Sequence, residues 1–201
     1  MARPPIDFWF SIGSMYTFLA VMRLPEVAAK SSTTFRWRPF SVRAIMIEMD
    51  NLPRNKPLKL AYMWRDLERR AQAHGIPYRR QPSYPLQNFD LANRIAVVGA
   101  EEGWCAHYTR AAYHRWFVDH DEAGSDSNNR ATLREIGQDP ERVVRRASSD
   151  EIAARYTTAT DEARKLGIFG APTFVIGKEL FWGDDRLDDA IAWQREHPTD
   201  S

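Results

Sequence analysis

The chain has 201 residues, of which 43% are hydrophobic, and its formal net charge is +1. This length suits one domain or a domain with a large insertion. The near-neutral balance gives no whole-chain attraction to phosphate, so we expect no nucleic-acid partner. The charge is uneven, however. Residues 36–80 carry eleven Lys or Arg against four Asp or Glu, whereas residues 181–201 carry six acids against two bases. A local basic surface suits an anionic small ligand, although solvated helix faces are the commoner cause of such runs.

Cysteine content and hydropathy exclude several classes of protein. Cys105 is the only cysteine, so neither an internal disulfide nor a two-cysteine redox pair can form; beside Trp104, we expect it in the core. The first residues lack the apolar segment of a signal peptide, and no apolar run approaches the ~20 residues that span a bilayer. We therefore expect a cytoplasmic protein without a membrane partner. The histidines lack the spacing of metal ligands, so we expect no metal site: His74, His107, His114, His120 and His197.

The N-terminal part has the pattern of a strand, a helix and a second strand. Residues 6–10 are apolar and aromatic, which predicts a buried strand. Residues 11–14, Ser-Ile-Gly-Ser, interrupt that strand. A helical pattern follows, with one apolar face formed by Met15, Phe18, Leu19 and Met22. Residues 33–40 are rich in Thr, Phe and Trp and predict a second strand, which the intervening helix makes parallel to the first.

Residues from about 43 to 167 have the pattern of helices. One helix keeps apolar spacing from Leu60 to Ala71 and stops at Gly75, and others are expected around 91–98 and 104–118. Residues 124–129 predict a polar loop. Further helix starts are indicated by Asp139-Pro140, as an N-cap with proline in the first helical position, and by a capping box of Ser148 and Glu151.

Residues 167–186 are the most informative segment. They predict a helix stop, a tight X-Pro turn, a short apolar strand, a Gly-Lys turn, a second strand and an acidic start, at Asp184 or Asp185, of a final helix through Trp193. Thioredoxin-like proteins build their ligand edge in this order, with a cis proline before the strand, and Pro172 holds that place. The whole order predicts an α/β, thioredoxin-like fold of residues 1–42 and 168–201, with residues 43–167 as a large α-helical insertion.

Ser14 stands at the turn where a thioredoxin keeps its first cysteine, and two interpretations are open. Serine is a preferred helix N-cap, a role for which Ser11 competes. Alternatively, its hydroxyl and the positive end of the helix stabilise a thiolate, which must belong to a ligand because the chain has no thiol there. A hydrogen bond to a charged acceptor contributes about 1.5–3 kcal/mol, which lowers a thiol pKa by about one to two units.

Several segments resemble one known family. Residues 6–20, Ile-Asp-Phe-Trp-Phe-Ser-Ile-Gly-Ser-Met-Tyr-Thr-Phe-Leu-Ala, resemble the opening segment of the kappa-class glutathione transferases and 2-hydroxychromene-2-carboxylate isomerases, which have a DsbA-like thioredoxin fold. Residues 62–67, 170–174 and 182–186 also resemble that family, in the family's order. The resemblance implies glutathione as cofactor, a homodimer, and Ser14 facing the glutathione sulfur.

The resemblance also implies the surroundings of glutathione. Ala171 would offer its backbone to the cysteinyl unit as an added strand. Asp184 and Asp185 would receive the γ-glutamyl amino group, although both could instead cap a helix. Asn51, or alternatively Asn55, would hold the tripeptide. Lys59 is a candidate partner for a ligand carboxylate. The cofactor-binding set is therefore Ser14, Met15, Tyr16, Asn51, Lys59, Ala171, Pro172, Asp184 and Asp185.

From this resemblance we expect a glutathione-dependent isomerase of an aromatic α-keto acid or its cyclic hemiketal. Thiolate addition would turn a double bond into a single bond, rotation would follow, and elimination would return glutathione. The basic part of the insertion would hold the carboxylate of this small aromatic substrate. Two alternatives remain open. One is a kappa-like glutathione transferase or thiol-dependent reductase, and the other is a non-catalytic thioredoxin-like protein that holds a peptide beside Pro172.

Overall fold

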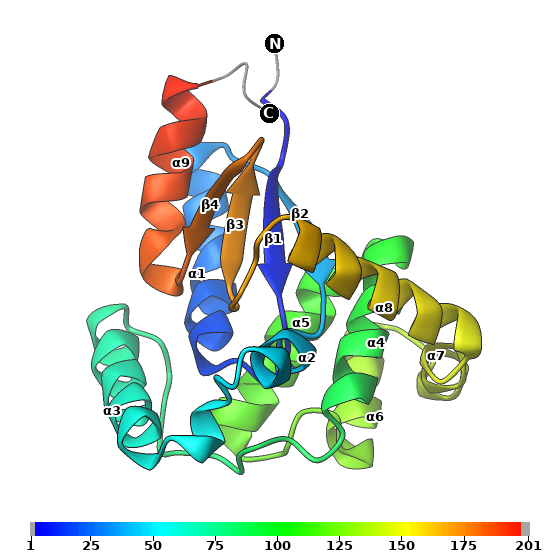
Figure 1. Cartoon of the computed structure of the whole chain (residues 1–201). Helices are drawn as coiled ribbons and strands as arrows, with labels where there is room; N and C mark the ends of the chain where they lie inside the picture. Colours follow the sequence, from blue (N-terminus) through cyan, green and yellow to red (C-terminus); the bar gives the residue numbers. More distant parts are fainter. Residues whose placement is uncertain (1–2, 198–201) are drawn as a thin grey trace.

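A computed structural model describes residues 3–197 (Figure 1). Within them, four strands form one mixed sheet in the order β2-β1-β3-β4. Their bounds are β1 Ile6–Phe10, β2 Phe35–Pro39, β3 Thr173–Ile176 and β4 Glu179–Trp182. β1 and β2 are parallel, whereas β3 runs antiparallel to both β1 and β4. The predicted strand over residues 6–10 and its parallel partner are confirmed, and the two halves of the chain meet in one sheet.

Two helices complete the thioredoxin-like part. α1, Met15–Ser31, connects the parallel strands, and α9, Leu187–Glu196, packs against β3 and β4. Both lie to the same side of the strands in Figure 1. Aromatic residues of β1 and β3 fill the sheet face, and the Phe8 ring stacks on Phe174 with 5.3 Å between centroids. The outer ends of the two predicted thioredoxin-like segments, residues 1–2 and 198–201, lie outside the described residues.

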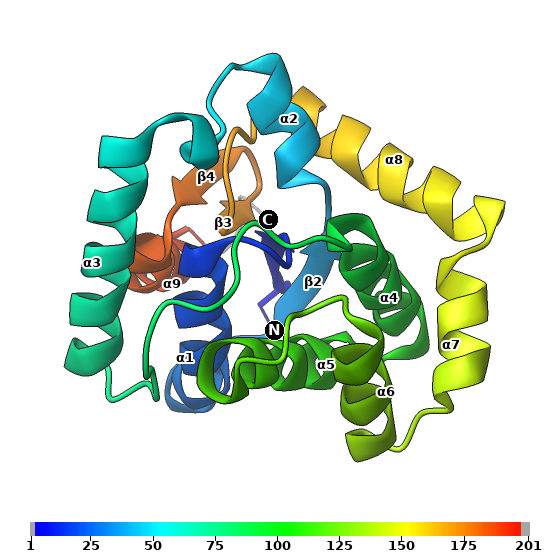
Figure 2. The same ribbon diagram turned by 90° about the horizontal axis from the view of Figure 1, so that it is seen from below.

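The helical pattern of the middle of the chain is confirmed. Its helices surround one end of the sheet, with α3 on one side and α4, α5 and α6 on the other (Figure 2). No helix within residues 3–197 is long and apolar enough to cross a membrane. The bounds are α2 Val42–Glu48, α3 Pro57–Ala73, α4 Phe89–Glu102, α5 Cys105–His114, α6 Asp126–Glu135, α7 Pro140–Ala147 and α8 Asp150–Lys165, with short turns of helix at Pro53–Asn55, Arg115–Asp119 and Asp184–Arg186.

The insertion shares its core with α1. The ring of Phe18 in α1 stacks on Phe117 with 4.1 Å between centroids, and Trp116 donates its Nε1 hydrogen to the Ser83 carbonyl at 3.0 Å. Cys105 is buried, as predicted, and burial raises the pKa of its thiol to about 12. A thiol with that pKa is not a nucleophile at neutral pH.

The predicted capping box at Ser148 is wrong. The N-cap of α8 is Ser149, whose Oγ accepts a hydrogen bond from the Ile152 amide at 3.4 Å. Ser148 still belongs to the end of α7, where its Oγ donates to the Val144 carbonyl at 2.8 Å. An N-cap needs extended backbone, and the chain adopts it one residue later than the pattern suggested.

Two other local predictions need correction. The polar loop at 124–129 is shorter than predicted, because Ser125 caps α6 through the Asn128 amide at 3.1 Å and the helix begins at Asp126. Neither Asp184 nor Asp185 caps the final helix. Both lie in a single turn of 3-10 helix, and α9 begins at Leu187 with no side-chain cap.

Candidate active site

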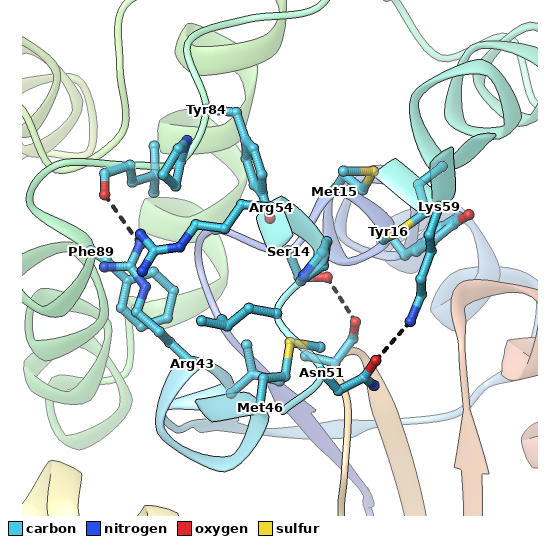
Figure 3. Close-up of a pocket in the computed structure, with 18 of the residues that line it drawn as sticks. Ser14, Met15, Tyr16, Arg43, Met46, Asn51, Arg54, Lys59, Tyr84 and Phe89 are labelled. Carbon is cyan, nitrogen blue, oxygen red and sulfur yellow. Dashed lines mark hydrogen bonds between the residues drawn. The ribbon is translucent and has the colours of Figure 1, made fainter. Parts of the chain in front are cut away.

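Ser14 lies where β1 passes into α1. Its backbone is extended and its Oγ accepts a hydrogen bond from the Thr17 amide at 3.3 Å, so Ser14 is the N-cap of α1. The same hydroxyl donates to the Ala171 carbonyl at 2.7 Å (Figure 3). Ser11, the competing candidate, is fully buried. The Ser14 hydroxyl therefore links the start of α1 to the segment before Pro172.

Two buried side chains of the insertion hold this turn. Asn93 of α4 donates to the Ile12 carbonyl at 2.9 Å and accepts from the Ile12 amide at 2.7 Å. The hydroxyl of Tyr113 in α5 lies 2.9 Å from the Ser14 carbonyl oxygen. Gly13 between them has a φ of +124°, and a Cβ there would lie 2.6 Å from the Phe89 ring. These contacts with the insertion fix the backbone of the turn that ends at Ser14. The sequence analysis missed both supporting residues, Asn93 and Tyr113.

The turn before β3 faces Ser14. The Ala171–Pro172 bond is cis, as predicted, and the Pro172 carbonyl accepts from the Gly183 amide at 2.9 Å. The Ala171 amide donates to no group within residues 3–197. Trp182, which is 51% exposed, covers the backbone of Gly170, where a Cβ would lie 2.2 Å from the indole nitrogen. Ala171 therefore presents a free backbone donor at an aromatic rim.

A cavity of about 260 Å³ opens beside Ser14 (Figure 3). Most of its lining is apolar, and its charged side chains, Arg43, Arg54 and Lys59, are all basic. Lys59 donates to the Asn51 Oδ1 at 2.9 Å, and Asn55 does not line the cavity. Six of the predicted cofactor residues meet here: Ser14, Met15, Tyr16, Asn51, Lys59 and Ala171.

A second hollow of about 410 Å³ adjoins this cavity and shares Tyr16, Tyr62, Ala171 and Trp182 with it. Its other lining residues are one glycine and five charged residues of both signs: Gly183, Asp66, Arg70, Asp184, Asp185 and Arg186. The two spaces therefore differ in chemistry. The cavity is apolar and basic, whereas the hollow suits a ligand that carries both an ammonium and a carboxylate.

Asp184 and Asp185 occupy different environments in this hollow. Asp184 is only 2% exposed, and Arg70 donates to its Oδ2 at 2.6 and 3.1 Å. Burial raises the pKa of Asp184, while Arg70 acts in the opposite direction. Asp185 is exposed and pairs with Arg186 at 3.0 Å. The charge of Asp184 is thus already balanced by Arg70 before a ligand binds. Asp185 is the more accessible carboxylate.

Tyr16 lines both the cavity and the hollow. Its hydroxyl donates to the Asp66 Oδ2 at 3.0 Å. Burial and the nearby Asp66 carboxylate raise the pKa of Tyr16 well above its ordinary value, so the phenol stays neutral. Within residues 3–197, no group of three or more His, Cys, Asp or Glu side chains is placed to hold a metal ion.

The mixed sheet and the cis proline before β3 define a thioredoxin-like fold, in which a serine and not a cysteine caps the helix that follows β1. Residues 5–191 match the model of the DSBA-like thioredoxin domain. The chain belongs to that family.

Named relatives span nearly the whole chain. A 2-hydroxychromene-2-carboxylate isomerase of Sphingobium xenophagum is 29% identical over 91% of this chain and 94% of its own length. Glutathione S-transferase kappa 2 of Caenorhabditis elegans is 27% identical over 92% and 89%. A solved structure of a 2-hydroxychromene-2-carboxylate isomerase superposes with a TM-score of 0.86, at 25% identity, over 96% of this chain and 95% of that one.

Proposed function

We propose that this protein is a glutathione-dependent isomerase of an aromatic α-keto acid or its cyclic hemiketal, of the 2-hydroxychromene-2-carboxylate type. One observation carries the proposal. The Ser14 hydroxyl stands at the N-terminus of α1, 2.7 Å from the Ala171 carbonyl oxygen, and lines an apolar basic cavity that adjoins a hollow of mixed charge. The relatives named as isomerases span the same length of chain.

The residues around Ser14 fit glutathione. The Ala171 amide and carbonyl can pair with an extended tripeptide as a further strand would. The hollow offers Asp185 to an ammonium and Arg70 to a carboxylate, which suits the γ-glutamyl end. Lys59, held by Asn51, offers a cation to the carboxylate at the other end. Asp184 is kept from direct pairing by Arg70, so its role is to orient that arginine.

Bound glutathione would supply the thiolate that adds to a conjugated carbon and leaves again after rotation about the new single bond. The chain's own residues prepare that chemistry. The amides of Met15 and Tyr16 have no carbonyl partner inside the helix and place partial positive charge beside Ser14. The Ser14 hydroxyl proton, which points at the Ala171 carbonyl, turns toward the sulfur once a peptide amide takes that carbonyl. Ser14 therefore acts as a hydrogen-bond donor and not as a nucleophile.

The cavity provides the substrate side. The rings of Tyr84 and Phe89 line it together with Met46 and Leu86, which suits a flat aromatic body. Trp182 and Phe169 stand at its rim, with 4.8 Å between ring centroids. These walls reduce the access of water to the reacting carbons, which protects an intermediate from hydrolysis.

A glutathione transferase remains the second candidate, because the kappa relative matches 92% of this chain. The two activities share the same cofactor site and differ in what happens to glutathione. An isomerase returns it unchanged, whereas a transferase converts it into a conjugate.

Conversion of 2-hydroxychromene-2-carboxylate to its open-chain isomer, 2-hydroxybenzylidenepyruvate, tests the proposal. We expect isomerisation that requires glutathione but leaves its free-thiol concentration constant. Stoichiometric loss of thiol with a stable conjugate would favour the transferase. Isomerisation at the same rate without any thiol would contradict the mechanism.

A further inference from the structure

The basic groups of the cavity are divided by Ser14. Figure 3 shows Lys59 on one side of Ser14, and the side chains of Arg43 and Arg54 reaching toward Phe89 on the other. None of the cavity's lining residues within 3–197 is an Asp or a Glu. Two guanidinium groups in an otherwise apolar wall repel each other and lose hydration, a cost that an anion bound between them would offset.

Arg43 is fixed in place before any ligand binds. Its guanidinium lies 3.9 Å from the centroid of the Phe89 ring, and one Nη donates to the Leu86 carbonyl at 3.1 Å. Burial lowers the pKa of Arg43, Asp90 opposes this effect, and the charge of Arg54 lowers the pKa further. Both arginines line the same cavity, and their positive charges interact. One hydrogen bond uses one of five N–H donors, which leaves donors for a ligand.

Arg54 differs from Arg43 in its freedom. It is exposed in the short turn Pro53–Asn55 between α2 and α3, and its side chain makes no hydrogen bond or ion pair within residues 3–197. A fixed guanidinium and an adjustable one can together hold a carboxylate by paired N–H donors. The rings of Tyr84 and Phe89 beside them suit an aromatic body joined to that carboxylate.

We propose that Arg43 and Arg54 form an anion site that holds the carboxylate of an aromatic substrate, on the side of Ser14 away from Lys59. The site selects aromatic monocarboxylates over neutral analogues of the same shape. This inference rests on the proposed function for its substrate class. Because the carboxylate can bind without glutathione, the anion site and the glutathione-dependent mechanism can be tested separately.

The test compares two probes by calorimetric titration without glutathione. Benzylidenepyruvate carries the carboxylate, and benzylideneacetone has a methyl group in its place. We expect the wild-type protein to bind the acid at least about tenfold more tightly than the ketone, since paired charged hydrogen bonds contribute that much. In the double variant Arg43→Gln, Arg54→Gln, the preference should fall to within about twofold while ketone affinity stays unchanged.

Arg145→Gln is the matched control, because Arg145 is exposed on α7 and lines none of these spaces. It removes one positive charge, as each of the two arginine substitutions does on its own, and should keep the full preference. If Arg43→Gln does not fold, Arg54→Gln and Arg43→Lys replace it, and each should lose part of the preference. Equal binding of both probes to the wild type, or an undiminished preference in the double variant, would overturn the proposal.

A parallel glutathione titration separates this inference from the proposed function. We expect glutathione to bind wild-type and doubly substituted protein with affinities within about twofold, because Lys59 and the hollow are untouched. If the wild type prefers the acid but binds no glutathione, the anion site stands and the isomerase mechanism falls. If glutathione binds but the preference is absent, the anion site falls alone.

Discussion

Replacement of Ser14 by alanine removes one hydroxyl with two partners in the free protein. Its donor bond to Ala171 measures 2.7 Å, and the Thr17 amide donates to it at 3.3 Å. A hydrogen bond to a thiolate contributes about 1.5–3 kcal/mol, but the neutral bond to the carbonyl that must be given up is worth about 0.5–1.5 kcal/mol. The net difference of about 1–1.5 kcal/mol corresponds to roughly one pKa unit.

Ser14→Ala is therefore expected to raise the pKa of the bound glutathione thiol by about one unit. The rising limb of the pH–rate profile should move upward by the same amount, and turnover at neutral pH should fall about tenfold. Thiolate absorbance in the ultraviolet, followed through a pH titration of the complex, measures the shift directly.

A control must separate this effect from loss of the helix cap, which costs about 1 kcal/mol of stability. Ser149→Ala removes the same kind of cap from α8, away from the site. It should lower the free energy of unfolding by a similar amount and leave the thiol pKa unchanged. An unshifted thiol pKa in Ser14→Ala, with glutathione bound, would refute the assigned role.

Three further changes test the framework of the site. Asn93→Ala should lower the free energy of unfolding in urea by at least about 2 kcal/mol and reduce turnover, because the Ile12 amide and carbonyl lose their buried partner; unchanged turnover would mean that Ser14 needs no such support. Gly13→Ala, with a Cβ 2.6 Å from the Phe89 ring and a strained φ, should destabilise by about 1–3 kcal/mol and weaken glutathione binding in calorimetry; normal affinity would contradict the tight fit. Glu102 pairs with Arg142, and this bond together with those from Trp104 and Arg146 lowers the pKa of Glu102 from 4.5 to about 2. The stability that the Glu102 carboxylate contributes through these bonds is present above pH 4.5 and is lost as the pH falls toward 2. Glu102→Gln should therefore make the free energy of unfolding depend less on pH in this acid range. The same pH dependence as in the wild type would show that the bonds contribute nothing.

The parts of the fold that sequence predicted best depend on local chemistry. The strand at 6–10, the N-cap at Ser14 and the turn at Pro172 each follow from a few adjacent residues. The cap of α8 was misplaced because two serines stand side by side, and only the path of the chain decides which one becomes extended.

The rest of the site depends on contacts between distant segments. Arg70 reaches Asp184 across 114 positions, and Asn93 reaches Ile12 across 81. A buried asparagine in an apolar helix was a faint signal for the second contact, but the sequence held none for the first. The family resemblance assigned the amine-binding role to Asp184 and Asp185 together, whereas the burial of Asp184 and its ion pair with Arg70 favour Asp185 for direct contact.

Calorimetric titration of the purified protein with reduced glutathione, up to millimolar ligand, is the most direct test of the central claim. We predict saturable binding at one site per chain, with weaker binding when Lys59 is replaced by glutamine or Asp185 by asparagine. If neither reduced glutathione nor S-methylglutathione binds, the account is contradicted, because no thiolate could then be held beside Ser14.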